Sequence, residues 1–97
     1  MGTGVEGLCQ CAAQAGRFYR RPEPQAPTYV QEGDEVQAGR TIGLIEVMKT
    51  FTPIRYEPGN HLPNPARIVR FFVDDGGDVE EGQALVEVQP LEAERGT

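Results

Sequence analysis

The stretch Val30-Gln-Glu-Gly33-Asp-Glu-Val36-Gln-Ala-Gly39-Arg-Thr-Ile42 decides the fold, because the chain repeats it 43 positions later as Val73-Asp-Asp-Gly76-Gly-Asp-Val79-Glu-Glu-Gly82-Gln-Ala-Leu85. Each copy reads as an apolar residue, a turn with glycine, a valine, a second turn with glycine and an apolar strand. The glycines suit tight bends or positive φ, and we expect the valine between them to point inward. Two copies are too few for a solenoid. They predict a two-fold-like β domain in which each half covers the apolar face of the other.

Apolar and β-branched runs around the repeat predict an all-β fold, a flattened β-barrel or sandwich of two quasi-two-fold halves. Arg40 to Val47 is apolar on both phases, so we expect that strand to be buried on both sides. Pro53 restricts its own strand to an edge of a sheet or to a position whose N–H points away from the sheet. The expected strands are residues 8–11, 15–19, 40–47, 50–56, 67–73 and 84–88, and the expected core residues are Ile42, Leu44, Val69, Leu85 and Val88.

The composition indicates one small domain, with residues 8–90 folded and residues 1–7 and 91–97 as flexible ends. The net charge of −6 argues against nucleic-acid binding, which needs a basic face. Neither a membrane-spanning apolar stretch nor a secretory signal is evident, so we expect a cytoplasmic protein without a membrane partner. The acidic residues are spread over predicted turns, which favours a solvated surface over a specific docking face.

Several kinds of catalytic chemistry are excluded by the residues that are missing. The chain has no serine and a single histidine, His61, so a Ser-His-Asp site cannot form. Cys9 and Cys11 lie two apart in a predicted strand, where they cannot easily reach disulfide geometry and lack the usual zinc spacing. We therefore expect neither a Ser-His-Asp site nor a metal site in this chain.

Lys49 is the only lysine, among eight arginines. Met48 and Lys49 separate two predicted strands by two residues, the length of a tight hairpin loop. Such loops prefer Asn-Gly or Asp-Gly, so Met-Lys is a poor choice on propensity and suggests a functional reason. A lysine amine at a hairpin tip is open to acylation. The alternative is an ordinary solubilising charge.

Two proline-rich segments cannot be helices or central strands, residues 21–27 and residues 58–65. We expect Pro58 to Pro65 to be a surface loop remote from the core, with His61 in solvent. If so, shortening that loop should not destabilise the fold severely.

The sequence Glu46-Val47-Met48-Lys49 resembles the Glu-Ala-Met-Lys of biotinyl domains, in which biotin acylates the lysine. The likeness extends over residues 8–88 and is greatest to the biotin carboxyl carrier protein of bacterial-type acetyl-CoA carboxylase. Residues 16–24 and 29–36 resemble the start of that subfamily, and Arg20 to Thr28 lies where its protruding thumb would be. The chain differs from the family motif at Val47 and Thr50, in place of Ala and Met.

The resemblance implies a non-catalytic carrier with biotin bound covalently to Lys49 and with Glu46 and Met48 recognised by a biotin protein ligase. Met48 has an equal alternative as a partly buried apolar turn residue. The implied carrier shuttles carboxybiotin between biotin carboxylase and a carboxyltransferase that acts on an acyl-CoA, most often acetyl-CoA.

Three alternatives to the biotin carrier stay open. A lipoyl-type carrier shares the two-fold plan, but Met48 before Lys49 argues against it. An unmodified scaffold or docking module would leave Lys49 free. An enzyme that uses Lys49 for Schiff-base chemistry would need a desolvated pocket, which a hairpin tip does not provide.

Overall fold

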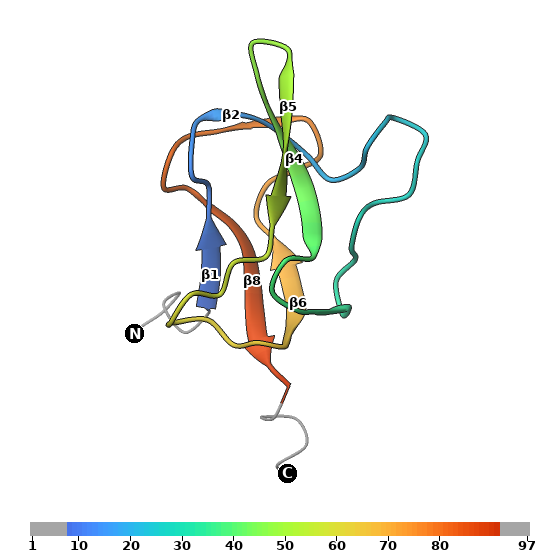
Figure 1. Ribbon diagram of the computed structural model, residues 1–97. Helices are drawn as coiled ribbons and strands as arrows, with labels where there is room; N and C mark the ends of the chain where they lie inside the picture. The colour runs from blue at the N-terminus through green and yellow to red at the C-terminus, as the bar shows by residue number, and fades with distance from the viewer. Residues whose placement is uncertain (1–7, 92–97) are drawn as a thin grey trace.

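Short runs of β-branched and aromatic residues, separated by glycine and proline, form eight strands in the computed structural model, which describes residues 8–91 (Figure 1). The strands are β1 (Leu8–Cys11), β2 (Gly16–Tyr19), β3 (Glu35–Val36), β4 (Thr41–Val47), β5 (Thr50–Arg55), β6 (Ala66–Phe71), β7 (Gly77–Val79) and β8 (Ala84–Pro90). Sequence analysis predicted all of these except β3 and β7, which are only two and three residues long. Of the expected flexible ends, 1–7 and 91–97, all residues except Leu91 lie outside the described residues. The described residues contain no helix long and apolar enough to cross a membrane.

The strands form two antiparallel sheets with the orders β1-β8-β6-β3 and β5-β4-β2-β7. Replacing each strand by the one four places further along the chain converts the first order into the second. The predicted two-fold relation is therefore confirmed, and each half contributes two strands to each sheet. The two sheets remain separate, so the described residues form a sandwich and not a closed barrel.

The glycines of the repeat occupy equivalent bends. Gly33 and Gly76 have φ of 95° and 86°, and Gly39 and Gly82 have φ of 92° and 88°. Only glycine adopts such values without strain, as the repeat predicted. The valine between each pair, Val36 or Val79, is buried between the sheets.

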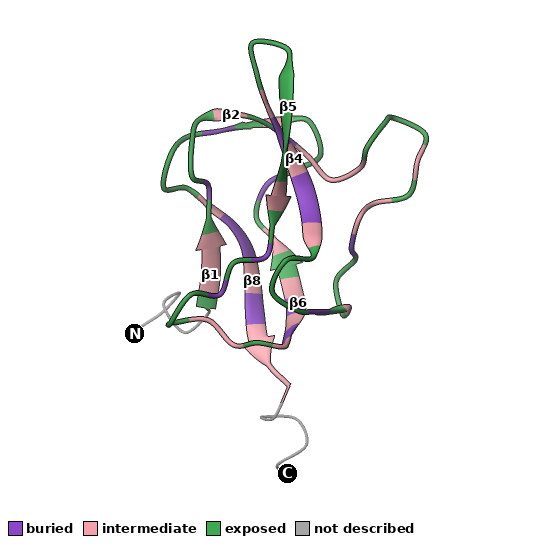
Figure 2. Ribbon diagram, viewed as in Figure 1, coloured by how far each residue is buried: buried purple, intermediate pink, exposed green. Residues whose placement is uncertain are grey.

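The core lies between the two sheets and draws on both (Figure 2). Ile42, Leu85 and Val88 are buried as predicted, whereas Leu44 and Val69 are only half-buried, contrary to expectation. The register of β4 shifts between Thr41 and Gly43, and a bulge of this kind allows Ile42 and Ile45 to face inward together. Leu44 consequently points away from the core. The buried side chains are Ala12, Phe18, Val30, Val36, Ile42, Ile45, Tyr56, Ala66, Ile68, Val73, Val79, Leu85, Val86 and Val88.

The expected burial of β4 on both sides is also only partly correct. β4 lies in the interior of its sheet, but Val47 near the tip is 37% exposed, because the hairpin extends beyond the body of the sandwich (Figures 1 and 2). β5 is an edge strand, which confirms the prediction drawn from Pro53.

The prediction of a remote Pro58–Pro65 loop is wrong. Tyr56, just before the loop, is fully buried, and its hydroxyl donates a hydrogen bond of 2.5 Å to the carbonyl of Pro63. Leu62 packs against the core, and Asn64 accepts a hydrogen bond from the backbone N–H of Ala38 at 3.1 Å. His61 is exposed, as expected. The composition of the loop predicted that it would lie in solvent away from the core. Instead, Leu62 and Asn64 attach it to the sandwich.

Candidate functional site

Met48 and Lys49 form the two-residue turn between β4 and β5, with φ of 51° and 68°. Two successive residues with positive φ are typical of a type I′ turn, whose twist matches that of the flanking strands. The hairpin was thus predicted correctly. Its turn also requires positive φ at two residues, Met48 and Lys49, that do not favour it, as the sequence indicated. The turn lies at one end of the molecule, and the start of β1 and the end of β8 lie toward the other (Figure 1).

The side chains at the turn are presented to solvent. Met48 is 92% exposed, which excludes the alternative of a partly buried apolar turn residue, and Lys49 is exposed as well. Phe51, two residues after the lysine, is 54% exposed. An exposed amine on a defined turn is accessible to an enzyme that acylates it, whereas Schiff-base chemistry needs a desolvated amine.

Glu46, the second predicted recognition residue, is held differently from Met48. It is half-buried, and its Oε1 accepts a hydrogen bond of 2.9 Å from the hydroxyl of Tyr19 on β2. Arg17 lies directly opposite Glu46 in the β2–β4 register, yet its Nε contacts Oδ1 of Asp78 at 3.4 Å. Hydrogen bonding to Tyr19, and then to Asp78, raises the pKa of the Arg17 guanidinium above its ordinary value.

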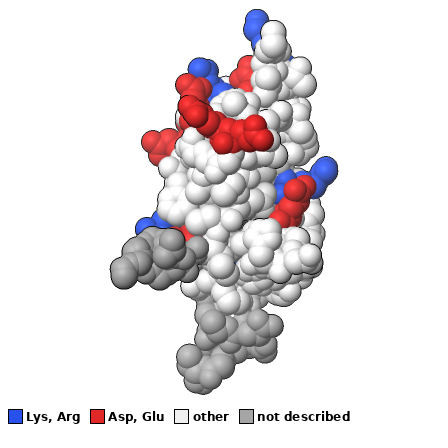
Figure 3. All heavy atoms as spheres, turned by 90° about the vertical axis from the view of Figure 1, so that its left-hand side faces the viewer, with Lys and Arg blue, Asp and Glu red and all other residues white. Residues whose placement is uncertain are grey.

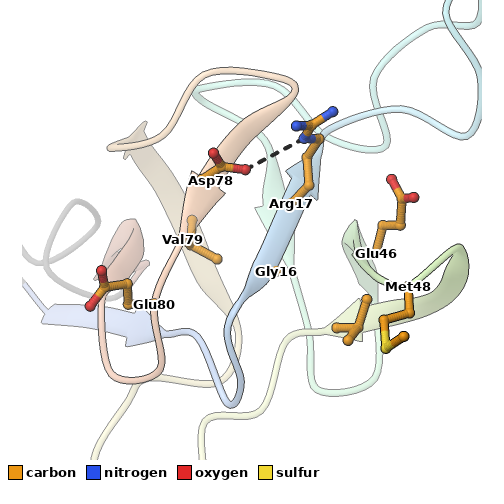
Figure 4. Close-up of a pocket in the computed structure, with 8 residues that line it drawn as sticks. Gly16, Arg17, Glu46, Met48, Asp78, Val79 and Glu80 are labelled. Carbon is orange, nitrogen blue, oxygen red and sulfur yellow. Dashed lines mark hydrogen bonds and ion pairs between the residues drawn. The ribbon is translucent and has the colours of Figure 1, made fainter.

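A shallow hollow of about 540 Å³ lies beside the hairpin (Figure 4). Gly16 permits the close approach of β2 and β4 here, because a Cβ at that position would come within 2.6 Å of the Glu46 carbonyl oxygen and 3.1 Å of Val47 Cγ2. The structure thus brings Glu46 and Met48 to one hollow. Its lining residues are Gly16, Arg17, Glu46, Val47, Met48, Asp78, Val79 and Glu80.

The segment after β2 projects from the sandwich where the resemblance placed a thumb (Figure 1). The carboxylate of Asp75 holds its base, since it accepts a hydrogen bond of 2.6 Å from the Arg20 N–H and lies 3.2 Å from Arg21 Nε. The Arg20 guanidinium lies 4.2 Å above the ring of Phe71. A mainly apolar groove of about 320 Å³ separates the segment from the hairpin, and it is lined by Tyr19, Arg21, Pro22, Glu23, Pro24, Leu44, Phe51 and Asp75.

Charge is unevenly distributed on the face that carries β7. Acidic side chains gather toward the hairpin end of this face, while most of the rest carries no charge (Figure 3). Asp78 lies on β7 and Glu80 directly after it, and both residues line the hollow beside the hairpin. The acidic residues are solvent-exposed there, in keeping with the predicted solvated surface.

Cys9 and Cys11 are free thiols on the edge strand β1. Partial burial, and then the nearby Glu87 carboxylate, raise the pKa of Cys9 above its usual value. A raised pKa leaves less of the reactive thiolate at neutral pH. Within residues 8–91, no group of three or more His, Cys, Asp or Glu side chains is placed to hold a metal ion.

Comparison with known proteins settles the family. The profile of the family described as Biotin-requiring enzyme matches residues 11–59, half of the chain, including the whole β4–β5 hairpin. The chain belongs to this family. The match includes Lys49 together with Glu46 and Met48.

Relatives of known name share this part of the chain. The biotin carboxyl carrier protein of acetyl-CoA carboxylase from Pyropia yezoensis is 38% identical over 76% of this chain and 43% of its own length. The protein of the same name from Nostoc is 31% identical over 77% of this chain and 38% of its own. That from Haemophilus influenzae is 29% identical, over 76% of this chain and 44% of its own. The chain thus spans less than half the length of these relatives.

One solved structure has a similar fold. A single-chain, multi-domain long-chain acyl-CoA carboxylase superposes with a TM-score of 0.68 at 19% identity, over 97% of this chain and 8% of the carboxylase. At this identity the likeness concerns the fold alone.

Sequence reasoning did not find Tyr19 or Asp78 at the site. Tyr19 belongs to β2 and Asp78 to β7, and their proximity to the hairpin depends on the pairing β4-β2-β7. A sequence shows that Arg17 and Tyr19 share a strand face, but it does not show which strand lies beside them.

Proposed function

We infer that Lys49 is the attachment site of covalent biotin and that this domain is a carrier in the carboxylation of an acyl-CoA, with acetyl-CoA as the acceptor. The observation that carries the proposal is the exposed amine at the tip of a strained two-residue turn, in a chain of the biotin-requiring family. The names of the relatives support the same reading.

The residues of the hairpin fit a covalently attached cofactor. Lys49 is the only lysine of the chain, so one side-chain amine is open to acylation, and the turn holds it clear of the sandwich. Bound biotin would supply a ureido nitrogen on which a carboxyl group can be carried. The domain itself provides the position of the amine and the surface that the modifying enzyme recognises, of which Glu46 and Met48 are the proposed parts. It performs no catalysis of its own.

The proposed partners are a biotin protein ligase, a biotin carboxylase and a carboxyltransferase in the cytoplasm. A ligase would use ATP to activate the biotin carboxyl group as an acyl-adenylate. Attack by the neutral Lys49 amine would then form the amide bond and release AMP. A carrier that visits two active sites raises the effective concentration of the carried group at each of them. The hairpin supports this role because it projects beyond the body of the sandwich (Figure 1).

Modification with defined ligases tests the cofactor. The chain is incubated with ATP, biotin and biotin protein ligase, and in parallel with lipoate and a lipoate ligase, and its intact mass is measured. We expect a single biotin adduct, absent from Lys49→Arg, and no lipoyl adduct. A biotin adduct that persists in Lys49→Arg would lie on another nucleophile of the chain and would contradict the assignment.

The same experiment separates the alternatives. A lipoyl adduct without a biotin adduct would identify a lipoyl-type carrier. No adduct with either ligase would favour an unmodified scaffold or docking module, and it would direct attention to Val47 and Thr50, where the chain departs from the family motif.

A further inference from the structure

The hydroxyl of Tyr19 selects one orientation of the Glu46 carboxylate. The two residues lie on the adjacent strands β2 and β4, and the Tyr19 hydroxyl donates to Glu46 Oε1 at 2.9 Å. The residue directly opposite Glu46 is Arg17, which would be the ordinary cross-strand ion-pair partner. Its guanidinium instead contacts Asp78 on β7 at 3.4 Å (Figure 4). The Glu46 carboxylate is therefore held by the hydroxyl of Tyr19, while the ion pair of Arg17 is made with Asp78.

Tyr19 is itself fixed in place. Its strand β2 lies between β4 and β7, and its ring centroid is 5.8 Å from that of Phe51 on β5. The ring is half-buried and forms part of the wall of the groove below the thumb. A hydroxyl on a packed ring stays at a defined point, so it can order the flexible side chain that binds to it.

The hydrogen bond leaves Glu46 prepared for a second contact. A carboxylate has two oxygens and can accept several hydrogen bonds. Tyr19 engages Oε1, and Glu46 also lines the hollow beside the hairpin together with Met48, the neighbour of Lys49. Ordering such a side chain before binding removes part of the entropy cost that a partner would otherwise meet.

We propose that Tyr19 is a positioning residue that holds the Glu46 carboxylate ready for the enzyme that modifies Lys49. The proposal rests on the proposed function, because it takes the modifying enzyme to be a biotin protein ligase. It adds a residue that lies 27 positions before Glu46 in the sequence and on a different strand.

Steady-state biotinylation of Tyr19→Phe tests this role. The substitution removes the hydroxyl but retains the ring that packs against Phe51. We expect the KM of the ligase for the chain to rise roughly threefold to tenfold, as for the loss of one charge-assisted hydrogen bond, with kcat within about twofold of wild type.

A double-mutant cycle shows whether Tyr19 acts through Glu46. Glu46→Ala alone should raise KM at least as much as Tyr19→Phe. In the Glu46→Ala background, Tyr19→Phe should have no further effect. Equal and additive effects in the two backgrounds would overturn the positioning role, because Tyr19 would then act independently of Glu46.

Tyr56→Phe provides the matched control. It also removes a hydroxyl that donates one hydrogen bond, but it lies at the far end of β5 from the turn. It should lower stability and leave KM unchanged, which distinguishes positioning from a general loss of stability. An unchanged KM in Tyr19→Phe, with wild type modified normally, would overturn the positioning role alone. A wild-type chain that no biotin ligase modifies would overturn the proposed function and this role with it.

Discussion

Met48 and Lys49 occupy a backbone region that residues with side chains rarely adopt. Their φ angles of 51° and 68° would suit Asn-Gly, the sequence that type I′ turns prefer. A left-handed conformation costs roughly 1–2 kcal/mol for a residue with a side chain. The chain maintains this strain at the position where the proposed modification occurs, which is consistent with selection for the lysine and not for the turn.

Replacing Met48-Lys49 by Asn-Gly should therefore stabilise the fold while it removes the modification site. We expect the free energy of unfolding to increase by about 1 kcal/mol or more, since Gly and Asn tolerate positive φ. Urea denaturation monitored by circular dichroism measures the change, and Lys49→Arg serves as the control that removes the amine but keeps the strain. A double variant less stable than Lys49→Arg would show that the turn is not strained.

The strand β5 lies at the edge of its sheet, and Pro53 interrupts its row of backbone N–H donors. In a hairpin closed by a two-residue turn, hydrogen-bonded and non-hydrogen-bonded pairs alternate from the closing pair Val47–Thr50. Pro53 pairs with Leu44 and thus takes a non-hydrogen-bonded position, where a backbone N–H would point to the free edge. Its missing N–H costs the β4–β5 ladder nothing and removes a donor that another strand could use.

Pro53→Thr should restore that donor and promote association between β5 edges. We expect the sedimentation coefficient to rise with protein concentration in this variant and to remain constant in wild type. Thr50→Val, which makes the same strand more apolar without adding a donor, should behave like wild type. A Pro53→Thr protein that stays monomeric throughout would contradict this role of the proline.

The loop between β5 and β6 is a second element whose role depends on one side chain. Burial raises the pKa of Tyr56 above its ordinary value of 10.0. Because the folded-state pKa exceeds the unfolded one, the stabilisation from the neutral phenol is complete below about pH 10 and is lost as pH rises through the folded pKa.

The free energy of unfolding should consequently fall more steeply above about pH 10 in wild type than in Tyr56→Phe. At neutral pH the variant should be less stable by about 1 kcal/mol, through loss of the hydrogen bond to Pro63. Denaturation curves of both proteins at several alkaline pH values measure both effects. Parallel pH profiles would mean that Tyr56 does not carry the alkaline loss.

For the whole molecule, the internal repeat predicted most of the architecture. The glycine pairs and the valines between them determined the bends and the inward faces, and the hairpin loop length placed Lys49 at a tip. These features are local, so a sequence can show them. The short strands β3 and β7 were missed because two or three residues carry too little periodic signal.

The remaining features depend on contacts between distant segments. Tyr19 and Glu46 are 27 positions apart and meet only through the β2–β4 register. The prolines and glycine of the Pro58–Pro65 loop predicted a loop remote from the core. Its contact with the core depends on Tyr56, which precedes the loop, and on Leu62. Leu44 was predicted to be a core residue, but the bulge in β4 places it beside the groove between the hairpin and the segment after β2.

Transfer of labelled bicarbonate shows whether this domain carries a carboxyl group through Lys49. The biotinylated chain is incubated with biotin carboxylase, ATP and labelled bicarbonate, and then with carboxyltransferase and acetyl-CoA. We expect label to appear on the wild-type chain, to move to the acyl-CoA in the second step, and never to appear on Lys49→Arg. A fully biotinylated wild-type chain that acquires no label would show that the domain is not a carboxyl carrier.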